Sequence, residues 1–210
     1  MTNMNFNDLI RFHLLFYRED EYIEIDKVLL AWKDRIDDIE KKLSSYLRVD
    51  SIYYKHNLDI SMFCIGLGIN AMQYLSDAIY NYDKKLYGVT IVHKRLTNLN
   101  SFDFFNPFNF IVEHPLKDIV LLYQSDYISF EEFKSIIANY RIDTLSATFC
   151  MARLLYRVDV FDFLETKRDL EADQKINFNL KKEIYKIKKA YSLLKEIYSI
   201  RPIDWLEESL

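Results

Sequence analysis

Glycine and proline are scarce in this chain: each occurs only three times in 210 residues. Folds built from many short strands need frequent turns, and turns use Gly and Pro most. Long helices with few interruptions need neither residue. Half of the residues are hydrophobic and 16% are aromatic, which is too many for a disordered chain. The sequence therefore predicts a mainly α-helical bundle with a buried core, formed by a single domain over residues 1–210.

The hydrophobic pattern divides this domain into three regions. Residues 1–84 are predicted to be helical, residues 86–113 to form a small β-loop unit, and residues 115–210 to be helical again. The predicted helices are 6–17, 25–47, 59–82, 116–123, 129–139, 158–166, 179–200, one that starts after Asp143, and a last turn at 204–206. The polar segment 167–177 is predicted to be a flexible loop.

Several helix starts carry a side chain that can accept hydrogen bonds from the first turn. Asn5 or Asn7 can cap the first helix, and Asp143 and Asn179 precede two later ones. Ser129 followed by Glu132 has the spacing of a capping box. These signals fix where the predicted helices begin.

The segment 59–82 is apolar on nearly all sides, so we expect it to be the central helix, with Asp59 as its cap. Gly66 and Gly68 lie inside it, and each costs about 1 kcal/mol relative to Ala there. Close approach of a neighbouring helix is the favoured explanation. The alternative, a phosphate-binding loop, would need these glycines between a strand and a helix start.

The only strands expected are at 87–93 and 108–113. Val89, Ile91 and Val92 mark the first strand, and an Asn-rich polar loop separates it from the second. Two short strands of this kind form a hairpin-like unit and not a full sheet.

Charge and composition exclude several classes of function. The net charge is −4 with both signs mixed along the chain, which is unlike a nucleic-acid-binding protein. No stretch has the roughly 18 uncharged apolar residues of a membrane span, and no targeting segment is evident. Cys64 and Cys150 lie in apolar helical contexts, which indicates a reduced, cytoplasmic protein. The abundance of Asn, Ile, Lys and Tyr is typical of AT-biased bacterial coding.

Metal and thiol chemistry are not indicated either. The four histidines are scattered and lack the paired spacing of metal ligands, so no metal site is predicted. His13 lies on an apolar helix face and is expected to be a core or helix-end histidine. Cys150 lies between Phe149 and Met151, which indicates a buried, unreactive thiol.

The segment from His93 to Asn100 reads His-Lys-Arg-Leu-Thr-Asn-Leu-Asn. It resembles the His-Gly-Asp-Leu-His-x-x-Asn motif that follows a strand in the C-terminal lobe of the protein-kinase-like fold. Aminoglycoside and choline phosphotransferases have this fold, and bacterial spore-coat kinase-like proteins are the nearer likeness. His93, Leu96 and Asn100 match in register. Pro115 to Ile119 resembles the Pro-x-x-Asp-Leu segment that opens a helix in these families, and Asp118 matches its acid. The resemblance runs from about residue 6 to the end.

The resemblance implies roles for His93, Asn100 and Asp118, with His93 structural, but the motif is altered at its catalytic position. Arg95 stands where these families have Asp, and a permanently charged Arg cannot accept a proton or hold a metal ion. Arg95 is instead a candidate anion-binding residue.

The metal position and the nucleotide lobe of these families also have no clear counterpart. Asp103, Asn106 and Glu113 do not fit the place of the metal-binding Asp. Nothing before residue 85 resembles the β-rich lobe that binds ATP phosphates. ATP and Mg²⁺ are therefore expected as cofactors only if such a lobe is supplied from elsewhere.

Two main functions follow. The chain is a non-catalytic kinase-like C-terminal lobe, acting as a pseudo-enzyme, a scaffold or a fragment of a longer phosphotransferase-like protein. The alternative is an unrelated α-helical protein-interaction domain. An active small-molecule kinase would require the missing lobe.

An aromatic run in the β-loop unit suggests a contact surface. Its members include Phe102, Phe104, Phe105 and Phe108, with Phe110 and the early Phe12, Phe16 and Tyr17 added to the same predicted face. Few cations surround them, so a base-stacking platform is not indicated. Large apolar patches are rarely left in water, so we expect a protein partner or a homo-oligomer, by default a homodimer, to cover this surface.

Overall fold

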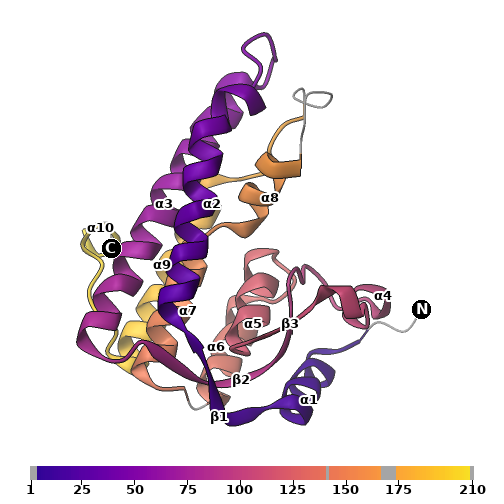
Figure 1. Ribbon diagram of the computed structural model, residues 1–210, viewed down its shortest axis with the longest axis vertical. Coiled ribbons are helices and arrows are strands. Elements are labelled where there is room, and N and C mark those ends of the chain that lie inside the picture. Colours follow the sequence, from indigo (N-terminus) through magenta and orange to yellow (C-terminus); the bar gives the residue numbers. More distant parts are fainter. Residues whose placement is uncertain (1–3, 141, 167–173, 209–210) are drawn as a thin grey trace.

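The computed structural model describes residues 4–140, 142–166 and 174–208. Over these residues the protein is mainly helical with one small antiparallel sheet, as predicted (Figure 1). The helices are α1 (Phe6–Phe16), α2 (Ile25–Tyr46), α3 (Tyr54–Asn81), α4 (Ser101–Phe104), α5 (Leu116–Gln124), α6 (Phe130–Asn139), α7 (Thr144–Leu155), α8 (Val158–Thr166), α9 (Leu180–Tyr198) and α10 (Asp204–Glu207). The strands are β1 (Arg18–Glu24), β2 (Lys85–His93) and β3 (Phe110–Glu113), and η1 (Pro107–Asn109) is a short 3-10 helix. Most of the predicted flexible loop, 167–173, lies outside the described residues.

Helices α1, α6, α7 and α9 start where their capping residues predicted. Asn5 caps α1 and Ser129 caps α6, each in a capping box with the residue three positions on. Asp143 accepts a hydrogen bond from the first turn of α7, and Asn179 does the same for α9. These caps satisfy backbone N–H groups that have no partner inside the helix.

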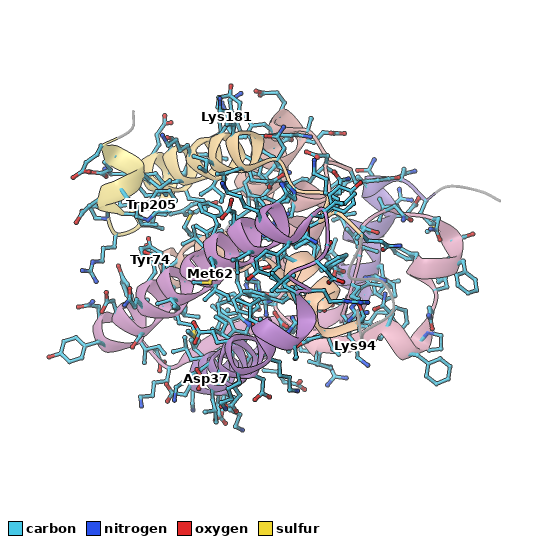
Figure 2. All side chains as sticks on the ribbon, turned by 90° about the horizontal axis from the view of Figure 1, so that it is seen from above. Asp37, Met62, Tyr74, Lys94, Lys181 and Trp205 are labelled. Carbon is cyan, nitrogen blue, oxygen red and sulfur yellow. The ribbon has the colours of Figure 1, made fainter. Side chains whose placement is uncertain are left out.

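Helix α3 is the longest element and packs against α2, α7 and α8. Seen from above, it lies between α2, which carries Asp37, and α9, which carries Lys181 (Figure 2). The predicted start at Asp59 was wrong, because the helix begins at Tyr54. A tertiary contact explains the extra turn: the buried Asn57 side chain donates to the Gln174 carbonyl and accepts from the Ile176 N–H, both at 2.9 Å.

The two glycines of α3 have different roles. A Cβ on Gly68 would lie 2.7 Å from Ile36 Cδ1 on α2 and 3.3 Å from Phe161 Cζ on α8, so close helix approach explains this glycine. A Cβ on Gly66 would meet nothing within 4 Å. The packing explanation therefore holds for Gly68 and fails for Gly66.

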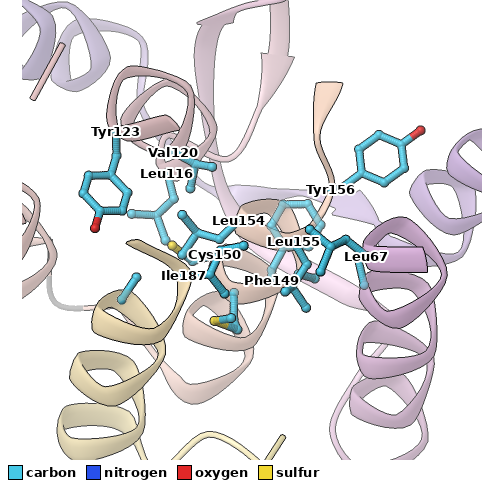
Figure 3. Close-up of a cluster of buried hydrophobic side chains, with 14 of the residues drawn as sticks. Leu67, Leu116, Val120, Tyr123, Phe149, Cys150, Leu154, Leu155, Tyr156 and Ile187 are labelled. Carbon is cyan, nitrogen blue, oxygen red and sulfur yellow. The ribbon is translucent and has the colours of Figure 1, made fainter. Parts of the chain in front are cut away.

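The core is centred on α7, which packs against α3, α5 and α9. Leu116 and Val120 of α5 lie beside Leu154 and Cys150 of α7 (Figure 3). Every residue of α7 from 145 to 155 is buried. Burial of this kind, at roughly 25 cal/mol per Å² of apolar surface, is the main stabilising contribution to the fold.

The sheet has the order β1-β2-β3, with both pairs antiparallel. The β2–β3 pair confirms the predicted hairpin-like unit, with Thr90 opposite Glu113 and His93 opposite Phe110. The prediction of no other β structure was wrong, because β1 pairs along the outer edge of β2 with an irregularity between Arg18 and Tyr22. Strand β1 reads REDEYIE and is almost wholly exposed, so it has no apolar alternation by which it could be predicted.

Helix α3 is also long and apolar enough, by length and composition, to cross a membrane. Half of its most apolar window is buried inside the fold, as in the core helix of a globular domain.

Candidate functional site

A buried carboxylate, Asp118, lies at the junction of β2, α1 and α5. Pro115 precedes the first turn of α5 and brings Asp118 to the end of β2. Asp118 Oδ1 accepts from the His93 backbone N–H at 2.9 Å, and Oδ2 accepts from His93 Nδ1 at 2.7 Å and from His13 Nε2 at 3.0 Å. The side chains of Asp118 and His93 are fully buried. One acid therefore fixes both the backbone and the ring of His93.

The second ring nitrogen of each histidine also has a hydrogen-bond partner. His93 Nε2 lies 2.9 Å from the Phe104 carbonyl, so both ring nitrogens of His93 face acceptors and both must carry hydrogen. His93 is therefore an imidazolium. His13 Nδ1 lies 3.0 Å from the Tyr140 hydroxyl, on the other side of the ring from Asp118. The buried group is an ion pair of Asp118 and His93, and His13 supplies a third hydrogen bond to the carboxylate.

Burial opposes both charges in this pair, and hydrogen bonding overcomes it. Burial disfavours the imidazolium of His93, but the bond to Asp118 raises the pKa of His93 above 6.5. Burial disfavours the carboxylate of Asp118, but the bonds from His13 and His93 hold the pKa of Asp118 below 3.8. The pair is charged near neutral pH.

The loop that follows His93 is held by a residue that the sequence did not single out, Asn109. The Lys94 N–H donates to the Asn109 carbonyl at 2.6 Å. The Arg95 N–H donates to Asn109 Oδ1 at 3.0 Å, and Asn109 Nδ2 donates back to the Arg95 carbonyl at 2.6 Å. Asn109 therefore fixes the backbone of the loop at Lys94 and Arg95.

The side chains of Arg95 and Asn100 point to different places. The Arg95 side chain is 60% exposed, and its Nε lies 2.6 Å from Asp162 Oδ2 on α8. Asn100 donates from its Nδ2 to Asn98 Oδ1 at 2.5 Å, a contact within the loop. The structure thus brings His93 and Asp118 together and places Arg95 on the opposite side of the loop, facing α8.

Arg95 lies at the edge of a cleft of about 1110 Å³ between α2, α8 and the β-loop unit. This volume is slightly above the range of about 300–1,000 Å³ that is typical of small-molecule sites. Its cationic lining residues are Lys27, Arg35, Lys94, Arg95, Lys117 and Arg153. Its acidic lining residues are Glu24, Glu113 and Asp162. Cations therefore outnumber carboxylates along its walls.

Glu113, at the end of β3, forms the inner wall of the cleft with Lys117 and Arg153. Glu113 Oε2 lies 3.3 Å from Lys117 Nζ, and Glu113 Oε1 is in ion-pair contact with Arg153 Nη2. Burial lowers the pKa of Lys117, whereas Glu113 favours its charged form. The guanidinium of Arg153 lies over the rings of Trp32 and Phe149, at 5.4 and 4.9 Å.

This cluster does not fit the Mg²⁺ ion that phosphotransferases use. Two cations, Lys117 and Arg153, already contact the Glu113 carboxylate. A divalent ion there would face two positive charges. Across residues 4–140, 142–166 and 174–208, no group of three or more His, Cys, Asp or Glu side chains could hold a metal ion.

The aromatic interface candidates divide into buried and exposed residues. Phe104 is 1% exposed and packs edge-on against Phe12 and near the His93 ring, so it belongs to the core in this structure. Phe102, Phe105 and Phe108 are well exposed. The surface that remains for a partner is the exposed side of the 101–109 segment.

Comparison with known protein families assigns a class to this arrangement, that of kinase-like proteins. The family described as Spore coat putative kinase YutH matches residues 12–197, nearly the whole chain, and the chain therefore belongs to this family. Comparison with curated proteins and with solved structures found no match.

Several contributors to the site carried no sequence signal of their own. Tyr140 follows the last residue of α6, Arg153 comes from α7 and Asp162 from α8, and each is far in sequence from the residue that it contacts. His13 was expected to be a core or helix-end histidine, and it is buried in α1. Its bond to Asp118 joins residues 105 positions apart, which a single sequence does not reveal.

Proposed function

We propose that this protein is a non-catalytic member of the kinase-like spore-coat family, which acts by binding through its cleft. The observation that carries the proposal concerns two positions, those of a catalytic base and of a metal-binding carboxylate, which phosphoryl transfer requires. Arg95 stands at the position of the catalytic acid, and Glu113 is contacted by Lys117 and Arg153. A base to orient the acceptor hydroxyl and carboxylates to hold Mg²⁺ are both needed for the reaction.

The proposal includes a likeness to the C-terminal lobe of the kinase-like fold. Three features support this likeness. Strand β2 ends in His93, the buried Asp118 of α5 accepts from the His93 backbone N–H, and the long helix α3 precedes the strand. The described residues before β2 form α1, β1, α2 and α3, and they contain no β-rich lobe with a Gly-rich loop. ATP and Mg²⁺ enter the proposal only with a lobe supplied from elsewhere.

An alternative function is an α-helical interaction domain, favoured by the exposed phenylalanines of the 101–109 segment. These two functions are compatible if the aromatic surface holds a second copy or a protein partner while the cleft holds an anion. A cytoplasmic setting, without nucleic acid as a partner, is part of the same proposal.

The test is a turnover assay with purified full-length protein, ATP and excess Mg²⁺. We expect no phosphate release above that of the buffer. The variant Arg95→Asp restores an acid at the altered position, and we expect no activity from it either, because Glu113 still has two cationic neighbours. Mg²⁺-dependent turnover that Asn100→Ala abolishes would refute the proposal. Turnover that Asn100→Ala leaves unchanged would indicate a contaminating ATPase.

A further inference from the structure

The inner wall of the cleft carries more positive than negative charge. Glu113, Lys117 and Arg153 are 8%, 7% and 8% exposed, and all three line the cleft. One carboxylate faces two cations, so this buried cluster has a net charge of +1. Burying an unbalanced charge is costly, and a bound counter-ion removes that cost.

The outer wall of the same cleft is different. Arg35 contacts Asp162 at 2.5 Å and Glu165 at 2.7 Å, and Arg95 also contacts Asp162 at 2.6 Å. Two cations thus meet two carboxylates, and their charges balance. The unbalanced charge lies on the inner wall and at Lys94, whose Nζ donates to the Phe108 backbone carbonyl.

The inner wall also has hydrogen-bond donors without acceptors. Arg153 Nε is buried and has no hydrogen-bond partner among the described residues; the one acceptor beside it without a hydrogen bond, Glu113 Oε1, is already in ion-pair contact with Arg153 Nη2. Lys117 has three N–H donors, and its ion pair is with the carboxylate of Glu113. Buried donors without acceptors are rare in folded proteins. The net positive charge of the cluster and the unpaired N–H of Arg153 therefore both favour binding of a negatively charged acceptor.

The remainder of the cleft fits an apolar group. Val28, Ala31 and Val112 line it beside Trp32, whose ring stacks on Tyr156 with centroids 4.2 Å apart. This stacking and the cation–π contacts of Arg153 hold the cluster in place. A ligand with an anionic head and an apolar body matches both parts.

We propose that the cleft binds a small oxyanion ligand, a phosphate monoester or a carboxylate with an apolar body, whose head group contacts Lys117 and Arg153 without a metal ion. This inference deepens the proposed function, because it names the ligand class of the same cleft. It differs from nucleotide binding by a kinase, where Mg²⁺ carries the phosphate charge.

The test is isothermal titration calorimetry of the full chain in EDTA with three probes. Phenyl phosphate and benzoate represent the two oxyanion head groups, and benzyl alcohol is the uncharged control. We expect one or both anions to bind and the alcohol not to. Equal binding of all three probes, binding of neither anion, or binding that appears only with added Mg²⁺ would overturn the inference.

Two substitutions move the charge of the wall in opposite directions. Lys117→Met removes a cation and keeps the length of the side chain, so we expect anion affinity to fall by about tenfold or more. Glu113→Gln removes the competing carboxylate, so we expect affinity to rise by about tenfold. Damage to the fold does not explain tighter binding, which makes the second variant the decisive one. Lys41→Met, on an exposed part of α2, is the matched control and should bind as the wild type does.

The inference is refuted if neither Lys117→Met nor Glu113→Gln changes the affinity of the anions. The outcome of these binding experiments is independent of the outcome of the turnover assay. Mg²⁺-dependent ATP turnover would refute the non-catalytic proposal, whereas metal-free binding of phenyl phosphate or benzoate would still support the oxyanion site.

Discussion

Replacing Asp118 by Asn tests whether the buried acid holds the loop in place. The substitution keeps the shape of the side chain and removes its charge. The amide oxygen can still accept from the His93 N–H, but the amide NH₂ then faces ring nitrogens that are themselves donors. His93 would remain buried without its counter-charge.

The expected loss follows from three contacts of 2.7, 2.9 and 3.0 Å to a fully buried carboxylate. A hydrogen bond to a charged group contributes about 1.5–3 kcal/mol, and breaking a buried ion pair costs about 3–5 kcal/mol. Because the three contacts share one carboxylate, their contributions do not add. We expect Asp118→Asn to lower the free energy of unfolding by about 3–5 kcal/mol. At about 2–4 °C per kcal/mol, the melting temperature should fall by roughly 6–20 °C.

Urea denaturation followed by far-UV circular dichroism measures this loss. Asp38→Asn is the matched control, because Asp38 is an exposed residue of α2 with a 3.6 Å contact to Lys41. We expect that control to change the free energy of unfolding by less than about 1 kcal/mol. A loss below about 1 kcal/mol for Asp118→Asn would show that the acid does not hold the loop.

Three further predictions concern pH, packing and association. Stability should be greatest near pH 6.5. The pKa of His93 is raised in the folded protein, so the stabilisation from its charged form is complete below pH 6.5 and is lost as the pH rises through the folded pKa. Burial lowers the pKa of His114 to about 3, so the stabilisation from its neutral form is lost as the pH falls from 6.5 toward 3. Unfolding free energies from pH 4.5 to 8.5 check this, and a monotonic profile contradicts it. Gly66→Ala should stabilise the protein by about 0.5–1 kcal/mol, whereas Gly68→Ala, whose methyl group would crowd α2, should not stabilise it; urea titrations separate the two. Light scattering should show a species larger than one 25.3 kDa chain, and Phe105→Asp should shift it toward monomer; wild-type protein that stays monomeric at high concentration would remove the basis for the interface.

The helical part of the fold was predictable because its signals are local. The caps at Asn5, Ser129, Asp143 and Asn179 depend on residues within one turn, and the apolar stripes repeat with the helix. Strand β1 was not predictable, since its pairing with β2 uses backbone groups and its side chains are mostly exposed. The sequence signals secondary structure most clearly where side chains are buried.

The candidate site was predictable only where its residues lie in short sequence motifs. His93 and Asp118 were found because they lie in two short segments with a recognisable order. Asn109 and Arg153 were not, because their roles depend on which elements pack around the loop. The interface prediction was limited in a similar way. Phe104 is buried and its neighbour Phe105 is exposed, and composition alone does not tell which of two adjacent phenylalanines is buried.

The structure separates the residues that support the loop from the residues that give it chemistry. Support comes from Asp118 and Asn109, whose bonds to the loop involve its backbone and therefore do not depend on the side chain at position 95. The charge around the loop depends on that side chain and on Glu113: Arg95 is positive, and Glu113 is neutralised by Lys117 and Arg153. Because Asp118 and Asn109 hold the backbone, the loop keeps its shape whatever side chain stands at position 95. In this chain it holds an arginine at the edge of a cationic cleft, which agrees with the proposed binding function.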